Sequence, residues 1–100
     1  MVTHIVYFWL KEGLDQESKD QFVAGAKSLL SIDSLAHGYV GVPASTEKRA
    51  IIDSSYDYAL ITIFEDIEAH DAYQVHPVHD AFRELAHLWD RVQIYDSEIV

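Results

Sequence analysis

The sequence predicts one α+β domain with the element order β-α-β-β-α-β, the ferredoxin-like arrangement, in which four antiparallel strands carry both helices on one face. Three observations lead to this prediction. Runs of β-branched and aromatic residues occur at the start, in the middle and near the end of the chain. Two segments between these runs place apolar residues at helical spacing. The chain has 100 residues, 49% of them hydrophobic, which suffices for one core, so residues 1–100 are treated as a single domain.

The first half of the chain supplies two strands and a helix. Residues 2–10 are almost all β-branched or aromatic, which is typical of a strand. Asp15 can cap the helix expected over residues 16–31. Residues 37–42 form the second strand, and a polar connection follows over residues 44–57. The apolar face of the helix is expected to consist of Phe22, Val23, Ala26, Leu29 and Leu30.

The second half repeats the pattern with a divided helix. Residues 58–64 give the strongest strand signal in the chain, and Asp66 can cap a short helix that ends near Gln74. Pro77 suits the first turn of the next helix, because the N–H that proline lacks would have no partner there. Residues 92–95 alternate as a final strand. The apolar face of the second long helix is expected to consist of Val78, Phe82, Leu85, Ala86 and Trp89.

Both faces of the predicted sheet are apolar. The face expected to point away from the helices contains Ile5, Tyr7, Trp9, Ile61 and Ile63. A half-exposed antiparallel sheet normally alternates apolar with polar residues, and a large bare apolar face is uncommon on a monomer. We therefore expect a homodimer formed through the sheet faces.

Composition argues against several classes of partner. The formal net charge is −10, so the chain lacks the basic surface that nucleic acid requires. Cysteine is absent, which rules out disulfides and thiolate metal sites. No apolar run is long enough for a membrane span, and the first residues lack the features of a signal peptide. We expect no nucleic acid, no membrane and a cytoplasmic location.

The segment YQVHPVHDAF, from Tyr73 to Phe82, carries the most chemistry. His79 borders the apolar face of its helix and lies in the first turn, where the helix dipole disfavours imidazolium. A neutral imidazole can act as a general base. Tyr73 could donate a hydrogen bond to the oxygen of a substrate carbonyl while negative charge develops on that oxygen. His4, on the helix-facing side of its strand, could orient His79 or hold the polar end of a substrate. Together these groups favour aldol-type chemistry.

Other interpretations of the histidines remain open. Tyr73 and His79 could be structural or could simply contact a ligand, and His76, next to Pro77, suits a capping role. Alternatively, His76 and His79 could bind zinc together with His4. Proline weakens this reading, because His76 would point away from the inner face of the helix. The remaining histidines, His37, His70 and His87, are expected to face solvent.

Three segments resemble the stress-responsive A/B-barrel (Dabb) family over nearly the whole chain: HIVYFWLK, YDYALITIF and, above all, YQVHPVHDAF. The resemblance implies a dimeric α/β barrel of ferredoxin-like subunits. Most members have no assigned reaction, and the best-understood relatives are plant polyketide cyclases of the olivetolic acid cyclase kind, which need no cofactor. The resemblance thus implies a small apolar pocket for a carbonyl-containing or polyketide-like molecule and, if the chain is an enzyme, a cyclase or lyase with a histidine base. The alternative is a non-catalytic, stress-associated structural or ligand-binding dimer.

The resemblance also assigns site residues. It places the catalytic groups at His79 and Tyr73, with His4 beside them, and implies no metal or other cofactor, although some plant relatives hold magnesium through main-chain carbonyls after the first helix. Two departures bear on the substrate: Tyr58 stands where the cyclase has a histidine, and Ala26 where it has a tyrosine. The substrate-binding residues are then Val6, Phe8, Phe22, Tyr58, Leu60, Phe82, Trp89 and Ile94.

Overall fold

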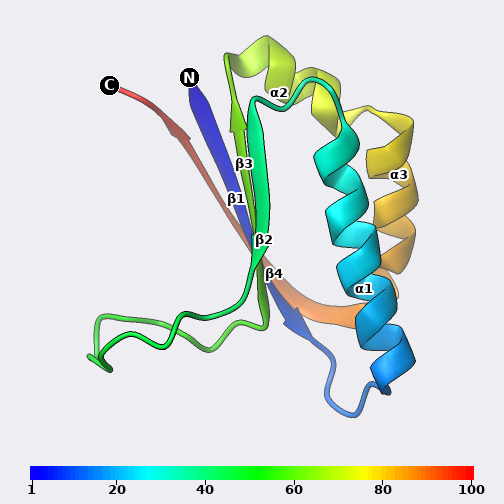
Figure 1. Cartoon of the computed structure of the whole chain (residues 1–100), viewed down its shortest axis with the longest axis vertical. Coiled ribbons are helices and arrows are strands. Elements are labelled where there is room, and N and C mark those ends of the chain that lie inside the picture. Colours follow the sequence, from blue (N-terminus) through cyan, green and yellow to red (C-terminus); the bar gives the residue numbers. More distant parts are fainter.

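In the computed structural model of residues 1–100, the helices lie on one face of a four-stranded antiparallel sheet, and no helix covers the other face (Figure 1). The strand order is β2-β3-β1-β4, which confirms the predicted ferredoxin-like α+β fold. The elements are β1 (Val2–Leu10), α1 (Gln16–Ser28), η1 (Leu29–Ser31), β2 (His37–Gly41), β3 (Tyr58–Phe64), α2 (Ile67–Gln74), α3 (Pro77–Arg83), η2 (Glu84–Leu88) and β4 (Trp89–Glu98), where η marks a 3₁₀ turn.

Each helix begins at the capping residue that the sequence indicates. Asp15 and Asp66 each accept a hydrogen bond of 2.8 Å from the backbone N–H three residues further on. At the start of α3, His76 Nδ1 accepts a hydrogen bond of 3.1 Å from the N–H of Val78, and Pro77 occupies the first helical position. These side chains satisfy N–H groups that have no partner inside the helix. The predicted capping role of His76 is therefore confirmed.

The end of the chain differs from the prediction. Helix α3 ends at Arg83 and tightens into η2, so Trp89 begins β4 instead of closing the apolar face of a helix, and Ala86 is exposed. Strand β4 has ten residues, although the alternation predicted only residues 92–95. The physical reason is that β4 is an edge strand with mostly exposed polar side chains, so its hydrophobic period is weak outside that stretch.

The core lies between the helices and the sheet. Along β1 the side chains of His4, Val6 and Phe8 are buried on the helix side, as the alternation predicted. Helix α1 approaches α3 and η2 closely at Gly25, where a Cβ atom would lie 2.4 Å from Cδ1 of Leu85. This close approach lets α1 pack directly against the second helical segment.

The sheet face without helices is apolar, as predicted. Its side chains Ile5, Tyr7, Trp9, Ile61 and Ile63 are only partly buried in the single chain. The connection from residue 42 to residue 57 leaves the sheet on this side, opposite the helices (Figure 1). It exposes 79% of Ile51 and 43% of Ile52. None of the helices is both long enough and apolar enough to span a bilayer.

Candidate active-site cavity

A cavity of about 210 Å³ lies between the helical layer and strands β1 and β4. Most of its lining is hydrophobic, and its polar side chains are those of His4, Tyr73, Gln74, His79 and Arg83. Few polar groups in an apolar concave surface are typical of a small-molecule site. The residues predicted from the sequence that line this cavity are His4, Val6, Phe8, Leu60, Tyr73, His79, Phe82, Trp89 and Ile94.

Phe22 and Tyr58 were also expected to line the pocket, and the structure places them elsewhere. Phe22 is completely buried beneath the cavity, with its ring 5.1 Å from that of Phe8 and 6.0 Å from that of Phe82. Tyr58 packs on Phe22 at 5.2 Å but belongs to a different hollow, at the C-terminal end of β1. Because Tyr58 is the first residue of β3, its ring lies beyond the end of the cavity.

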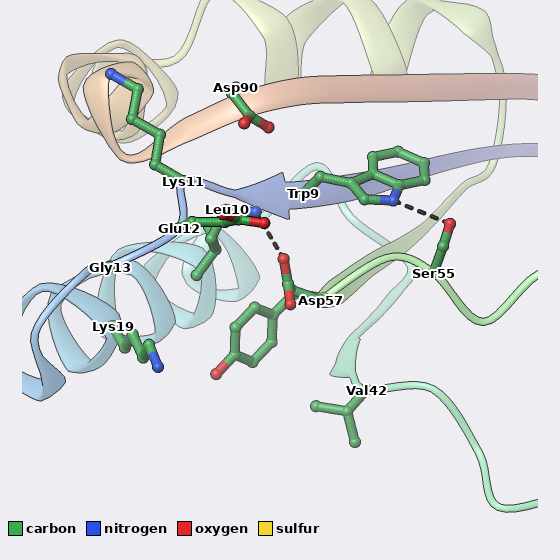
Figure 2. Close-up of a pocket in the computed structure, with 11 residues that line it drawn as sticks. Trp9, Leu10, Lys11, Glu12, Gly13, Lys19, Val42, Ser55, Asp57 and Asp90 are labelled. Atoms are coloured by element: carbon green, nitrogen blue, oxygen red, sulfur yellow. Dashed lines mark hydrogen bonds between the residues drawn. The ribbon is translucent and has the colours of Figure 1, made fainter.

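This second hollow has a volume of about 550 Å³ and carries charges of both signs, including Lys11, Lys19 and Asp90 (Figure 2). Several of its polar groups already have partners. The Leu10 N–H donates to Asp57 Oδ2 at 2.7 Å, and Trp9 Nε1–H donates to Ser55 Oγ at 3.1 Å. These bonds tie the end of β1 to the start of β3. We therefore place the candidate site in the smaller apolar cavity.

His79 and Tyr73 meet in the wall of the cavity. Their ring centroids are 4.9 Å apart at an interplanar angle of 83°. His79 Nδ1 is buried and has no hydrogen-bond partner in the chain. Tyr73 is only 1% exposed, because its ring packs among those of Phe64, His4 and His79. The pair thus combines one imidazole nitrogen without a partner and one buried phenol.

Burial sets the protonation of both groups. Burial lowers the pKa of His79, the positive charge of Arg83 lowers that pKa further, and Asp80 acts in the opposite direction. The Asp80 carboxylate is itself paired with Arg83 at 3.2 Å. Burial raises the pKa of Tyr73 to about 12. At neutral pH the site therefore offers a neutral imidazole that can accept a proton and a phenol that can donate a hydrogen bond.

His4 forms the polar end of the cavity. It is 4% exposed, and its Nδ1–H donates to Oδ1 of Asp96 at 2.5 Å. The two residues are direct cross-strand partners in the β1–β4 register, so their side chains share the helix-facing side of the sheet. Burial lowers the pKa of His4, and the hydrogen bond that His4 donates to the Asp96 carboxylate opposes this shift.

One histidine was placed wrongly by the sequence. His70 was expected to face solvent, but its side chain is only 18% exposed and its ring centroid lies 4.8 Å from that of His4. The signal was its spacing, because a residue three before the buried Tyr73 and four before Gln74 shares their side of α2. His37 and His87 are exposed, as predicted.

The predicted alternative zinc ligands do not assemble as expected. The Nδ1 atom of His76 caps α3 instead of joining His79 and His4. The groups whose potential ligand atoms lie within 4.8 Å of one another are His4, His70 and Asp96. Sequence reasoning did not select Asp96, although it follows Ile94 at the spacing of one strand face.

Comparison with known proteins agrees with this fold. The family model described as Stress responsive A/B Barrel Domain matches residues 2–99. A dabb family protein with a ferredoxin-like fold from Mesorhizobium loti is 24% identical with a TM-score of 0.78, over 99% of this chain and 96% of that chain. A dimeric ferredoxin-like protein from Thermobifida fusca is 19% identical with a TM-score of 0.78, over 98% and 90%.

A third solved structure is a hydroxynitrile lyase from Passiflora edulis. It is 21% identical to this chain with a TM-score of 0.80, and the match covers 99% of this chain and 93% of the lyase. At these identities, the likeness to solved structures establishes the fold. No curated protein sequence matches the chain.

Proposed function

This chain belongs to the stress responsive A/B barrel domain family, and we propose that it is a homodimer whose subunits each bind a small carbonyl compound and catalyse proton transfer beside the carbonyl, without a cofactor. One observation carries the proposal. His79 lines an apolar cavity, and its buried Nδ1 has no partner within the chain. Buried polar atoms are nearly always hydrogen-bonded. We therefore infer that a bound molecule supplies the missing hydrogen-bond partner of this imidazole nitrogen.

The proposed reaction begins with proton abstraction. His79 accepts a proton from the carbon next to the carbonyl. The C–H bond breaks, and its electron pair passes to the carbonyl oxygen to form an enolate. The hydroxyl of Tyr73, which its raised pKa keeps protonated, donates a hydrogen bond to that oxygen. The enolate carbon then attacks a second carbonyl, a C–C bond forms, and the proton held by His79 neutralises the new alkoxide.

If both carbonyls belong to one molecule, this sequence is an aldol-type cyclisation, and its reversal is a lyase reaction. His4 lies at the polar end of the cavity, where its Nε2 can accept a hydrogen bond from a hydroxyl group of the substrate. The hydroxynitrile lyase of similar structure supports the proposal only in showing that a protein with this fold can be a lyase.

The cavity volume favours a small substrate. Its value of about 210 Å³ is only moderately above the roughly 150 Å³ of an apolar cavity that accommodates benzene. A single ring or a short-chain carbonyl compound fits this space. On the β4 side, Val92 is 42% exposed and Ile94 is 45% exposed, so a longer polyketide-like chain would extend outward over these residues.

The proposed homodimer would cover the open sheet face. Its apolar side chains include Tyr7, whose ring lies 4.8 Å from that of Tyr56 in the projecting connection. The exposed Ile51 and Ile52 of the same connection extend beyond the sheet, where a second copy would meet them. An apolar surface of this kind is typical of a homodimer interface. The Thermobifida fusca protein of similar structure is described as dimeric, which also supports the proposal.

Hydrogen exchange tests the proposed catalysis. Wild type and His79→Ala would be incubated in D₂O with small ketones such as cyclohexanone and acetylacetone, and NMR would follow deuterium entry beside the carbonyl. We expect removal of the base to slow exchange by about 10² to 10⁴-fold, while ligand affinity changes far less. His87→Ala removes an exposed imidazole and should match wild type. Equal rates in wild type and His79→Ala would refute the proposal, and ligand binding without exchange would favour the non-catalytic binding dimer.

A further inference from the structure

The histidine pair between β1 and α2 converges on a single point. The amide nitrogen of Gln74 lies 3.4 Å from His4 Nε2 and 3.2 Å from His70 Nε2. Because an amide nitrogen only donates hydrogen bonds, this geometry assigns both Nε2 atoms as unprotonated acceptors. The orientation of the amide is consistent with this assignment, since Arg83 donates to Gln74 Oε1 at 3.4 Å.

The opposite nitrogen of each imidazole is held by a carboxylate. His4 Nδ1–H donates to Asp96 at 2.5 Å, and His70 Nδ1–H donates to Asp71 at 3.1 Å. In metal sites, a histidine ligand usually donates its second N–H to a carboxylate, which fixes the tautomer and makes the coordinating nitrogen more basic. Here, two histidines with this arrangement direct their free lone pairs at the same amide group.

We propose that His4 and His70 bind one divalent transition-metal ion of the zinc class through Nε2, at the position that the Gln74 amide now occupies. Asp96 and Asp71 act as the outer carboxylates, and water completes the coordination. Imidazole nitrogen is a preferred ligand of zinc and of its neighbours in the first transition row. This set differs from the His76, His79 and His4 set that the sequence suggested.

The surface around the pair provides a route for a cation. A hollow of about 430 Å³ borders the site, and its lining includes His70 and the carboxylates of Asp71, Asp96 and Glu98. Its three carboxylates produce a negative potential that concentrates cations. His4 and Gln74 line the apolar cavity, whereas His70 and Asp96 line the hollow, so the ion would lie between the two.

Gln74 gives the proposal a distinctive signature. Because its amide nitrogen contacts both Nε2 atoms, it competes with the metal. Gln74→Ala should therefore bind the ion more tightly than wild type, whereas His70→Ala should bind it at least tenfold more weakly. A generic acidic surface would respond to neither substitution. His4 is too deeply buried for its removal to be a clean test, while His70 is partly exposed.

The experiment is a calorimetric titration of the chelator-stripped protein with Zn²⁺ at neutral pH, without substrate, so its result does not depend on the proposed catalysis. We expect one ion per chain in wild type and in His87→Ala. NMR should show the imidazole signals of His4 and His70 shifting as Zn²⁺ is added. Equal affinity in His70→Ala and wild type, weaker binding by Gln74→Ala, or shifts confined to His37 and His87 would each overturn the proposal.

Discussion

Phe82→Ala should cost the protein less stability than Phe64→Ala, although both substitutions remove the same side chain from the core. Phe64 is 0% exposed, does not line the cavity, and packs on Tyr73 with ring centroids 5.2 Å apart. Phe82 is 6% exposed and forms part of the cavity wall, where it stacks on Trp89 at 5.5 Å. The comparison therefore isolates the effect of the cavity.

The expected magnitudes follow from the space each ring leaves behind. Truncation of a buried phenylalanine typically costs ~3–5 kcal/mol, and the cost rises by about 24 cal/mol for each Å³ of residual void. A void at Phe64 is closed on all sides, so we expect about 5 kcal/mol there. On one side Phe82 faces existing space of about 210 Å³, where it has no packing partner to lose. We expect about 3 kcal/mol for Phe82→Ala.

Urea denaturation followed by circular dichroism would measure the free energy of unfolding. All variants would be compared at one protein concentration, because the proposed dimerisation would couple to stability. A domain of this size has a total stability of about 5–15 kcal/mol, so the larger loss approaches complete unfolding. Phe64→Leu and Phe82→Leu provide a milder pair with the same expected order. A cost for Phe82→Ala equal to or above that for Phe64→Ala would refute the reasoning that the cavity exists in solution.

Three further predictions concern the site, the interface and a turn. Burial should hold the pKa of His79 below the ~6.5 of free imidazole. Because the unfolded chain then binds the proton more readily than the folded chain, the free energy of unfolding should fall as pH drops from ~6.5 toward the folded pKa. NMR titration of His79 at or above ~6.5 would contradict this. Ile61→Asp should convert a sedimenting dimer to monomer, whereas Ala24→Asp, on the exposed side of α1, should not; a monomeric wild type would exclude the interface. Gly13 has φ of +78°, so Gly13→Ala should cost about 1 kcal/mol in urea denaturation, and an unchanged midpoint would argue against that conformation.

The sequence predicted the parts of this molecule that depend on local physics. Asp15, Asp66 and His76 were recognisable as caps because a cap needs only a side-chain acceptor at the right step before a helix. The two-sided apolar pattern of β1 was equally readable, because side chains alternate with a period of two. The prediction that the apolar helix face continues to Trp89 was wrong, because the chain forms a 3₁₀ turn after Arg83 and side chains there no longer repeat every 3.6 residues.

The polar cluster of the site depends on register and could not be read from spacing alone. Asp96 meets His4 only because β4 pairs with β1 in one particular alignment. Gln74 joins them because α2 crosses that end of the sheet, which no local pattern specifies. His70 was misplaced because its spacing to Tyr73, which was the available signal, was not used. Tyr73 and His79 were selected both from the chemistry of their segment and from the resemblance to a known family, and their catalytic role stays a prediction.

The position of β4 at the sheet edge has a consequence for how such a protein can change over time. Val92 and Ile94 border the cavity, yet neither is held in a packed core, since both are more than two-fifths exposed. Substitutions of such exposed side chains usually alter stability only slightly. Residues at the cavity opening can therefore vary in size and polarity, and with them the molecules admitted, while the buried imidazole and phenol stay in place. In the proposed site, the residues that would select the ligand are thus distinct from those that would react with it, so one or two tolerated substitutions could admit a new ligand.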